Sequence, residues 1–385
     1  MRLFNNSCLY SLGLALACTG ISSCAPSNHG ETSIPEAMTD KGTVPVKQLY
    51  LNSQAFSFAA TPNLGGRALH FSVPGKPNLL LIDNAVATRP SPTPTADGQH
   101  IDYHGHIVWL GPQSQWWTHQ NLNPKRRDDG ARWPPDPWLV WNENETLTSS
   151  PTEIALQGAS SPLSGISLNK TFTVIDDGSK LLLTAQARNN NDHSVANNLW
   201  FNTRVTTDAV IYTPAPAHNS VRFNTPQSPH QPPAFLKLNN VLKISRAIAL
   251  GEDSEELHLD SADILDAEKS KGRLKSRREK LFIQANEGWI AAFIKGQLLL
   301  IEFEPIEASR IHPEHTLIEI YYAFGSSDSS EIIELEVHGP LSHYATGESI
   351  GFYETWQALA YTGIDSDAAR LSFLEAALKA SNSTR

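Results

Sequence analysis

Cysteine, methionine and net positive charge are all scarce in this sequence of 385 residues. The three cysteines, Cys8, Cys18 and Cys24, all precede residue 25, and there are only two methionines. The rest of the chain therefore offers no cysteine pair for a disulfide and no cysteine set for a metal. Acidic side chains outnumber basic ones by 40 to 30, for a formal net charge of −10. Without a basic stripe to follow a phosphate backbone, nucleic acid is not an expected partner.

Motifs for nucleotide binding or well-known hydrolytic chemistry are also missing. The sequence has no Walker loop, dinucleotide fingerprint, nucleophile elbow or zincin helix. His104 and His106 stand at positions i and i+2, so they would share one face of an extended strand, but we identify no third metal ligand for them. The sequence therefore predicts no cofactor and no metal.

The first 23 residues have the order of a secretory signal peptide. Arg2 precedes an apolar run from Leu9 to Cys18, and small residues follow. Ile21-Ser22-Ser23-Cys24 resembles the bacterial lipobox, whose cysteine is acylated and becomes the new N-terminus. Lipidation at Cys18 and plain secretion are the alternatives. Because Ala25 rather than Asp follows, lipoprotein sorting rules imply an outer-membrane lipoprotein, facing either the periplasm or the cell surface.

Strand-like segments dominate the chain after a polar, flexible tether predicted at residues 24–46. From 47 to 362, runs rich in Val, Ile, Leu, Phe and Tyr alternate with turn residues, which predicts one all-β domain. Asp177-Gly178 predicts a hairpin turn, and turns at 286–288 and 295–296 are expected to link three consecutive strands. Residues 363–385 predict a short helix, with leucines at helical spacing. The expected fold is a large antiparallel β-sandwich with a C-terminal helix.

Tryptophan is concentrated between residues 100 and 141, where six of the nine occur. A tryptophan face stacks well on the C–H face of a pyranose, so this segment suggests a sugar platform. Packing in the core is the alternative, especially for Trp138 and Trp141, which alternate along a strand-like run. Trp116 and Trp117 are adjacent and cannot both point inward from an extended segment, so one of them is expected to be exposed.

Two glutamates form a second candidate cluster. Glu334 and Glu336 share one face of a predicted strand that ends at a turn. Two acids at such a position suit a general base and its partner, although the polar face of an amphipathic strand gives the same pattern. Glu319 shows a similar but weaker pattern.

Several segments, in this order, resemble the galactose mutarotase-like superfamily, and specifically its bacterial branch, domain of unknown function 4380. They are Leu64-Gly65-Gly66-Arg67, HGHIVWLGP (104–112), Trp133-Pro134-Pro135-Asp136-Pro137, NNNDHSVANNLWFN (189–202) and ELEVHGPLSHYATGESIGFYETW (334–356). The resemblance extends from about residue 48 to 360. It implies a supersandwich fold with a concave, sugar-binding face.

The same resemblance implies roles for single residues. Glu336 matches the mutarotase base, and Arg67 and either His104 or His106 match sugar-contacting groups. The histidine that acts as general acid in mutarotases has no counterpart, because the segment reads Asn197-Asn198-Leu199-Trp200-Phe201. An amide cannot deliver a proton, and loss of this step typically costs about 10²- to 10⁴-fold.

These observations favour a carbohydrate-binding lipoprotein, held at the membrane by its lipid, over an enzyme. The residues expected to contact the sugar are Arg67, Trp109, Trp116, Trp117, Asn198 and Trp200. The first alternative is a sugar epimerase or lyase with Glu336 as base and His104 or His106 as acid. The second is a structural envelope protein whose aromatic loop docks a protein partner.

Overall fold

The computed structural model describes residues 46–90, 92–216, 221–227, 231–252, 274–325 and 331–382. The predicted signal peptide, Cys24 and the tether up to residue 45 lie outside the described residues. Within the described ranges, no helix is both long enough and apolar enough to cross a membrane.

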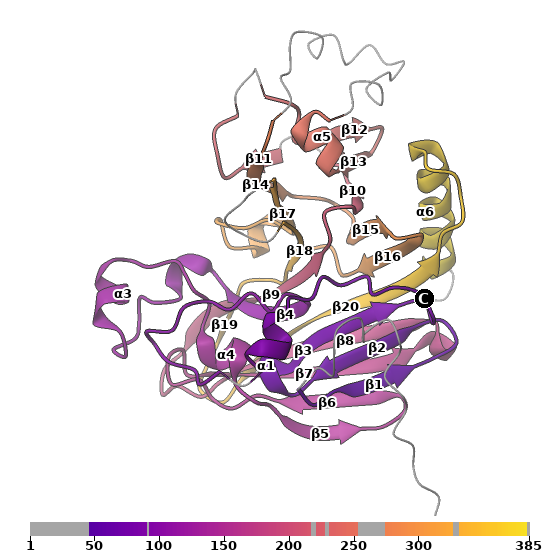
Figure 1. The fold of residues 1–385 in the computed structure, drawn as a ribbon. Helices are drawn as coiled ribbons and strands as arrows, with labels where there is room; N and C mark the ends of the chain where they lie inside the picture. Colours follow the sequence, from indigo (N-terminus) through magenta and orange to yellow (C-terminus); the bar gives the residue numbers. More distant parts are fainter. Residues whose placement is uncertain are drawn as a thin grey trace, which may run out of the picture. The chain divides into compact units, whose positions relative to one another are not determined.

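The described strands form two antiparallel sheets of ten strands each (Figure 1). The first sheet has the order β1 (Leu49–Asn52), β2 (Ser57–Thr61), β3 (Arg67–Ser72), β4 (His106–Gly111), β9 (Val195–Val205), β18 (Ile332–His338), β17 (Ile318–Phe324), β14 (Arg277–Ile283) and β11 (Val221–Phe223), with β19 (Ser342–Tyr344) also paired to β9. The second has the order β12 (Leu236–Leu238), β13 (Val241–Ile244), β10 (Val210–Pro214), β15 (Trp289–Ile294), β16 (Gln297–Glu302), β20 (Ser349–Ala360), β8 (Lys180–Asn189), β7 (Ile166–Ile175), β6 (Glu153–Gln157) and β5 (Glu145–Ser149).

The main hydrophobic core lies between these sheets, because successive side chains of a strand point to opposite faces. In β18, for example, Leu335 and Val337 belong to this core. Glu336 and His338 alternate with them and therefore lie on the outer face of the first sheet. The predicted all-β antiparallel sandwich is confirmed.

Two of the three predicted turns connect neighbouring strands. The short 3-10 turn η3 (Asp176–Gly178) joins β7 to β8, with positive φ at both Asp177 and Gly178. Lys295-Gly296 joins β15 to β16 in the same way. The hairpin expected at 286–288 is wrong, because β14 pairs with β17 in the first sheet and β15 with strands of the second. That connection crosses from one sheet to the other.

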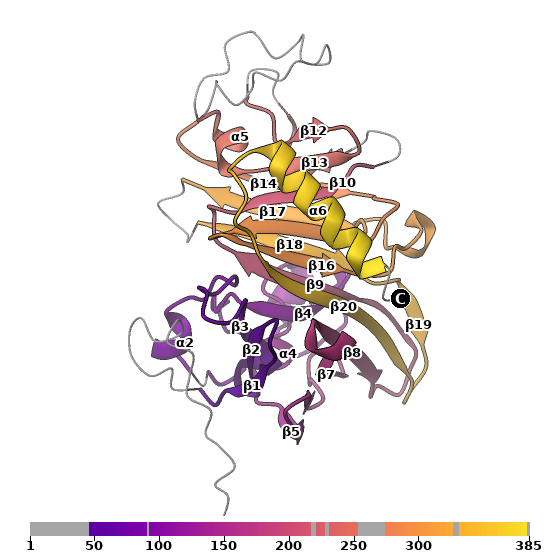
Figure 2. The same ribbon diagram turned by 90° about the vertical axis from the view of Figure 1, so that its right-hand side faces the viewer.

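Helices are few and, except for the last, short. They are α1 (Asn63–Gly66), α2 (Ala85–Thr88), α3 (Pro124–Asp128), α4 (Pro137–Trp141), α5 (Arg246–Leu250) and α6 (Asp367–Asn382), with further 3-10 turns η2 (Gln113–Gln115) and η5 (Ala308–Arg310). The predicted C-terminal helix is confirmed as α6. This helix lies over the second sheet (Figure 2). Its Leu374 and Ala377 belong to the same hydrophobic cluster as Tyr212 and Phe293 of that sheet.

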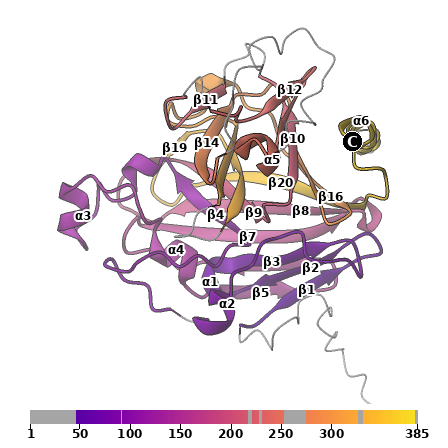
Figure 3. The ribbon, with the colours of Figure 1, turned by 45° about the horizontal axis from the view of Figure 1, so that its top comes forward.

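The strand-like reading of Trp138 and Trp141 is wrong, because both lie in helix α4. Asp136 caps this helix by accepting a hydrogen bond from the Trp138 backbone N–H at 3.0 Å, and Pro137 occupies its first position. Both residues are typical helix-start signals. Helices α1 and α4 lie together beside β4, and α3 lies farther out (Figure 3).

A left-handed turn leads into β4. His104 and Gly105 have φ values of 58° and 66°, so the extended strand begins only at His106. A Cβ atom at Gly105 would collide with the backbone carbonyl oxygen of Ala68, so this position requires glycine. The prediction that His104 and His106 share one strand face is therefore wrong.

Candidate functional site

The outer face of the first sheet collects aromatic and charged side chains from five neighbouring strands, β4, β9, β18, β17 and β14. Trp109 lies opposite Trp200, and Trp200 lies opposite His338 on the next strand. Glu336 lies opposite Glu319. Directly opposed residues of antiparallel strands have Cβ atoms about 4.5–5.5 Å apart, so strand register alone brings these side chains into contact.

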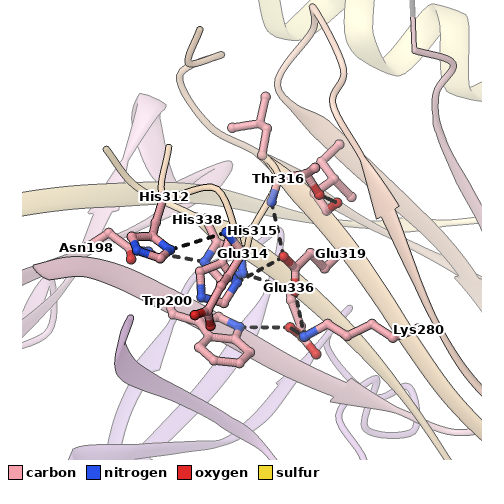
Figure 4. A network of polar contacts seen from close by, with 12 residues as sticks. Asn198, Trp200, Lys280, His312, Glu314, His315, Thr316, Glu319, Glu336 and His338 are labelled. Atoms are coloured by element: carbon pink, nitrogen blue, oxygen red, sulfur yellow. Dashed lines mark hydrogen bonds and ion pairs between the residues drawn. The ribbon is translucent and has the colours of Figure 1, made fainter. Parts of the chain in front are cut away.

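The charged cluster, defined here as Lys280, His315, Glu319, Glu336 and His338, is continuous, and all its members except the partly exposed Lys280 are buried (Figure 4). The Lys280 ammonium bridges two carboxylates, with Nζ 2.5 Å from Glu319 Oε2 and 2.7 Å from Glu336 Oε2. Lys280 is the most accessible member, with 14% of its side chain exposed. The cluster therefore reaches solvent chiefly along this lysine.

Three carboxyl groups of this face share two cations. Besides Glu319 and Glu336, Glu334 pairs with Arg204, whose Nε donates to Glu334 Oε1 at 2.9 Å. Burial raises the pKa of Glu336 well above its usual range, and repulsion from Glu319 and Glu334 adds to this, outweighing the attraction of Lys280. Burial also acts to raise the pKa of Glu319, but Lys280 and His338 lower it well below its usual range. Of these carboxyl groups, Glu336 is therefore the one that holds a proton most readily.

The two histidines of the charged cluster stack on each other. The rings of His315 and His338 are 4.1 Å apart at 21°. His315 Nδ1 lies 3.1 Å from Glu319 Oε1, and His338 Nε2 lies 3.4 Å from Glu319 Oε2. Burial, followed by electrostatic repulsion from His315, lowers the pKa of His338 to about 3, so its imidazole is neutral at neutral pH.

Three tryptophans, Trp109, Trp116 and Trp200, form an aromatic wall beside the charged cluster. Trp109 meets Trp200 edge-on at 5.0 Å, and Trp116 stacks on Trp200 at 5.8 Å. Trp200 also joins the cluster directly, because its Nε1 donates to Glu336 Oε2 at 2.9 Å and Lys280 Nζ lies 4.5 Å from its ring centroid. The tryptophan-rich segment and the glutamate strand thus share one face of the molecule.

A pocket of about 310 Å³ lies against this aromatic wall. Trp109 and Trp116 line it together with apolar side chains of α4, including Leu139 and Val140. Its polar lining comes from Gln115, His119, Gln120, Asp136, Ser164, Asn191, His193, Ser194 and Asn197. Glu336 does not line this pocket. The pocket therefore presents amide, hydroxyl, imidazole and carboxyl groups beside aromatic rings.

The structure places the two neighbouring tryptophans differently. Trp116 is partly buried in the aromatic wall, whereas Trp117 is fully buried in a separate small core with Ala96 and Leu163. Trp117 Nε1 donates to the carbonyl of Pro134 at 2.8 Å, and its ring lies under the guanidinium of Arg126. Of this pair, only Trp116 lines the pocket.

The expected sugar-contacting groups Arg67, His104 and His106 are also buried. Arg67 donates to the carbonyl oxygens of His104 and Val140 at 2.6 and 3.4 Å, so it ties the turn before β4 to helix α4. His106 lies on the inter-sheet face, where its ring packs on Trp356 at 5.0 Å and Nδ1 contacts Thr203 Oγ1. The sheet thus separates His106 from Glu336.

Asn198 joins the charged cluster rather than the pocket lining. Its side-chain amide lies 3.1 Å from Nδ1 of His338. Sequence reasoning missed His338, His315 and Lys280, although His338 follows Glu336 by two residues and so had to share its face. His315 lies four residues before Glu319, in the loop that leads into β17, and only the fold shows that this histidine turns back onto the sheet.

Comparison with known proteins identifies one family and a set of similar folds. The family model described as Domain of unknown function (DUF4380) matches residues 46–359. Similar solved structures include a galactose mutarotase-like protein from Lactobacillus casei, with 9% identity, a TM-score of 0.49, and coverage of 81% of this chain and 100% of that chain. A galactose mutarotase related enzyme from Lactobacillus acidophilus has 7% identity and a TM-score of 0.45, with coverages of 83% and 100%.

A third similar structure is a galactose mutarotase-like protein from Clostridium acetobutylicum, with 8% identity and a TM-score of 0.44, covering 82% of this chain and 96% of that chain. These similarities concern the fold. A search of curated proteins found no match.

Proposed function

This chain belongs to the DUF4380 family, and from its site we propose that it binds a carbohydrate, either a free sugar or the end of a glycan, in the pocket beside the aromatic wall. The observation that carries the proposal is the lining of this pocket, where Trp109 and Trp116 adjoin a set of amide, hydroxyl and imidazole side chains. Pyranose rings present an apolar C–H face and a rim of hydroxyls, and this lining complements both.

The size of the pocket and the scarcity of basic side chains among its described lining residues limit the kinds of ligand that fit. Its volume of about 310 Å³ lies at the lower end of the range of about 300–1,000 Å³ for small-molecule sites, which suits one sugar residue. Among the described residues, no lysine or arginine lines it, and its carboxylate, Asp136, is engaged by the hydroxyls of Ser161 and Ser164 at 2.7 Å. A neutral sugar therefore fits better than a sugar phosphate.

Titration of the purified protein with a glycan panel, followed by tryptophan fluorescence and calorimetry, tests the proposal. Trp116→Ala should abolish binding of any ligand found, because this ring lines the pocket. Trp133→Ala is the matched control, since Trp133 is 47% exposed and contacts the wall without lining the pocket. Equal losses in the two variants would point to a surface platform instead. Silence towards all glycans, with a protein partner recovered by cross-linking, would favour the docking alternative.

An enzyme acting on sugars is the second candidate, and the charged cluster is the observation that favours it. Glu336 is a buried carboxyl whose pKa burial raises well above its usual range, and it lies 2.7 Å from Lys280 Nζ. Such a group suits acid–base chemistry. On this face His338 and His315 are nearer partners for Glu336 than His106. Anomer exchange or uronate cleavage that is lost in Glu336→Gln would select this candidate.

The site of action in our proposal is the cell envelope, with the protein attached through a lipid on Cys24. The supporting feature is the sequence Ile21-Ser22-Ser23-Cys24 after an apolar leader. Expression in a bacterial host with labelled palmitate tests this. We expect label in the wild type but not in Cys24→Ala. Label that is retained in Cys24→Ala but lost in Cys18→Ala would place the lipid on Cys18 instead.

A further inference from the structure

We infer that His315, Glu319 and His338 form a binding site for one divalent transition-metal ion, represented by Zn²⁺. Each residue offers one ligand atom, and these atoms lie within 4.8 Å of one another. All three side chains are buried. Two imidazoles and one carboxylate make up the protein ligand set of zinc sites that keep a coordination position open. This inference goes beyond carbohydrate binding and does not depend on it.

The spacing of the donor atoms fits such an ion. Bonds of about 2 Å at tetrahedral angles place neighbouring ligand atoms about 3.3 Å apart. The observed separations are 3.1 Å between His315 Nδ1 and Glu319 Oε1 and 3.4 Å between His338 Nε2 and Glu319 Oε2. These two contacts use different oxygens of the Glu319 carboxylate, and a set of one donor atom per residue lies within 4.8 Å. Rotations of the three side chains would therefore bring the donors to metal-binding distance.

An unsatisfied buried nitrogen also points to a ligand. Nε2 of His338 is buried, and within the described part of the chain it makes no hydrogen bond, since its contact with Glu319 Oε2 at 3.4 Å does not have hydrogen-bond geometry. Leaving a buried polar atom unpaired is costly, so such atoms call for an explanation. A metal ion coordinated by this nitrogen would satisfy it.

Neighbouring groups hold the ligands in position. The side-chain amide of Asn198 lies 3.1 Å from Nδ1 of His338. It is the amide nitrogen, Nδ2, that faces Nδ1. Rotation of the amide by 180° would let its oxygen accept the Nδ1–H and leave Nε2 as the coordinating atom, an arrangement usual around metal-bound histidines. The backbone N–H of Thr316 donates to Glu319 Oε1 at 3.1 Å and orients the carboxylate.

Lys280 is the group that competes with the metal. Its ammonium already contacts Glu319, but it also lies 2.7 Å from Glu336, so it can keep a hydrogen bond to the Glu336 carboxyl group when a dication takes Glu319. Removing the lysine charge should therefore tighten metal binding. We expect Lys280→Met to bind Zn²⁺ at least about tenfold more tightly than the wild type, equivalent to about 1.4 kcal/mol.

Equilibrium dialysis of the metal-stripped full chain against Zn²⁺, with Co²⁺ absorption as a second readout, tests the inference. We expect about one equivalent of Zn²⁺ and a tetrahedral Co²⁺ spectrum, with no binding of Mg²⁺ or Ca²⁺, which prefer oxygen ligands. Binding should be lost in His338→Ala and retained in His343→Ala, the matched control, because His343 is exposed on β19. Asn198→Ala should weaken it by about 10- to 100-fold.

Circular dichroism of each variant separates loss of the site from loss of the fold. The inference is overturned if the folded wild type takes up no Zn²⁺, or if His343→Ala and His338→Ala lose it equally. Glycan titration of the metal-stripped protein is a separate measurement, so failure of one proposal does not imply failure of the other.

Discussion

Glu354 is a buried carboxyl group that should make stability depend on pH. It lies in β20 between Phe352 and Trp356 on the same strand face, and its side chain turns into the core between the sheets with 1% exposed. Trp356 Nε1 donates to Glu354 Oε2 at 2.8 Å. Burial raises the pKa of Glu354 from 4.5 to about 8, and the hydrogen bond from Trp356 only partly offsets this rise.

The direction of the effect follows from proton linkage. Between these two pKa values the folded protein holds a proton on Glu354 that the unfolded chain has released, so stability falls as pH rises. With a folded pKa of about 8 and an unfolded pKa of 4.5, the free energy of unfolding should fall by about 3.5 kcal/mol between about pH 5 and about pH 8 through this group alone.

Urea unfolding of the wild type and of Glu354→Gln at both pH values isolates this contribution. Glutamine keeps an oxygen that accepts from Trp356 but cannot ionise, so the variant should gain stability relative to the wild type as pH rises. The matched control is Glu375→Gln, exposed on α6, whose difference from the wild type should stay constant. A difference between the wild type and Glu354→Gln that does not change with pH would refute the reasoning.

Two further pairs of variants test the charged cluster and the turn before β4. Lys280→Met should lower the free energy of unfolding by about 3–5 kcal/mol, because it leaves the buried Glu319 carboxylate without its cation. Glu336→Gln replaces a neutral group and should lower it by less than about 1.5 kcal/mol. Equal losses in the two variants would mean that Glu336 is ionised. Gly105→Ala should lower the melting temperature more than Gly75→Ala, since both have positive φ but only Gly105 lacks room for a Cβ atom. Equal shifts would contradict the collision seen at Gly105.

Much of the fold could be predicted because its signals are local. The alternation of β7 and β8 and the turn residues Asp177-Gly178 specify a hairpin that needs no other part of the chain. At 286–288 the same kind of signal predicted a hairpin that does not form, because a turn sequence does not determine whether the next strand pairs within the same sheet. That choice depends on pairing partners distant in sequence, β17 for β14 and β10 for β15.

Only part of the candidate site could be predicted from the sequence, for a similar reason. Glu336 and the tryptophans stand out by composition and spacing, and their shared face follows from strand register. Lys280 and His315 look like ordinary polar residues in the sequence, and their importance comes from two carboxylates on other strands. For His106 the sequence pattern predicted too much. The left-handed backbone at His104 and Gly105 means that the strand begins only at His106, so its side chain points to the inter-sheet face.

The order of strands in the first sheet determines whether fragments of the chain can retain the site. Strands β4, β9, β18, β17 and β14 lie side by side, yet their residues run from His106 to His338 along the chain. Contacts of such long sequence separation form slowly, since a large loop must close before any of them is made. No fragment that omits either end of this span can hold the aromatic wall and the charged cluster together, so their properties have to be measured on the intact domain.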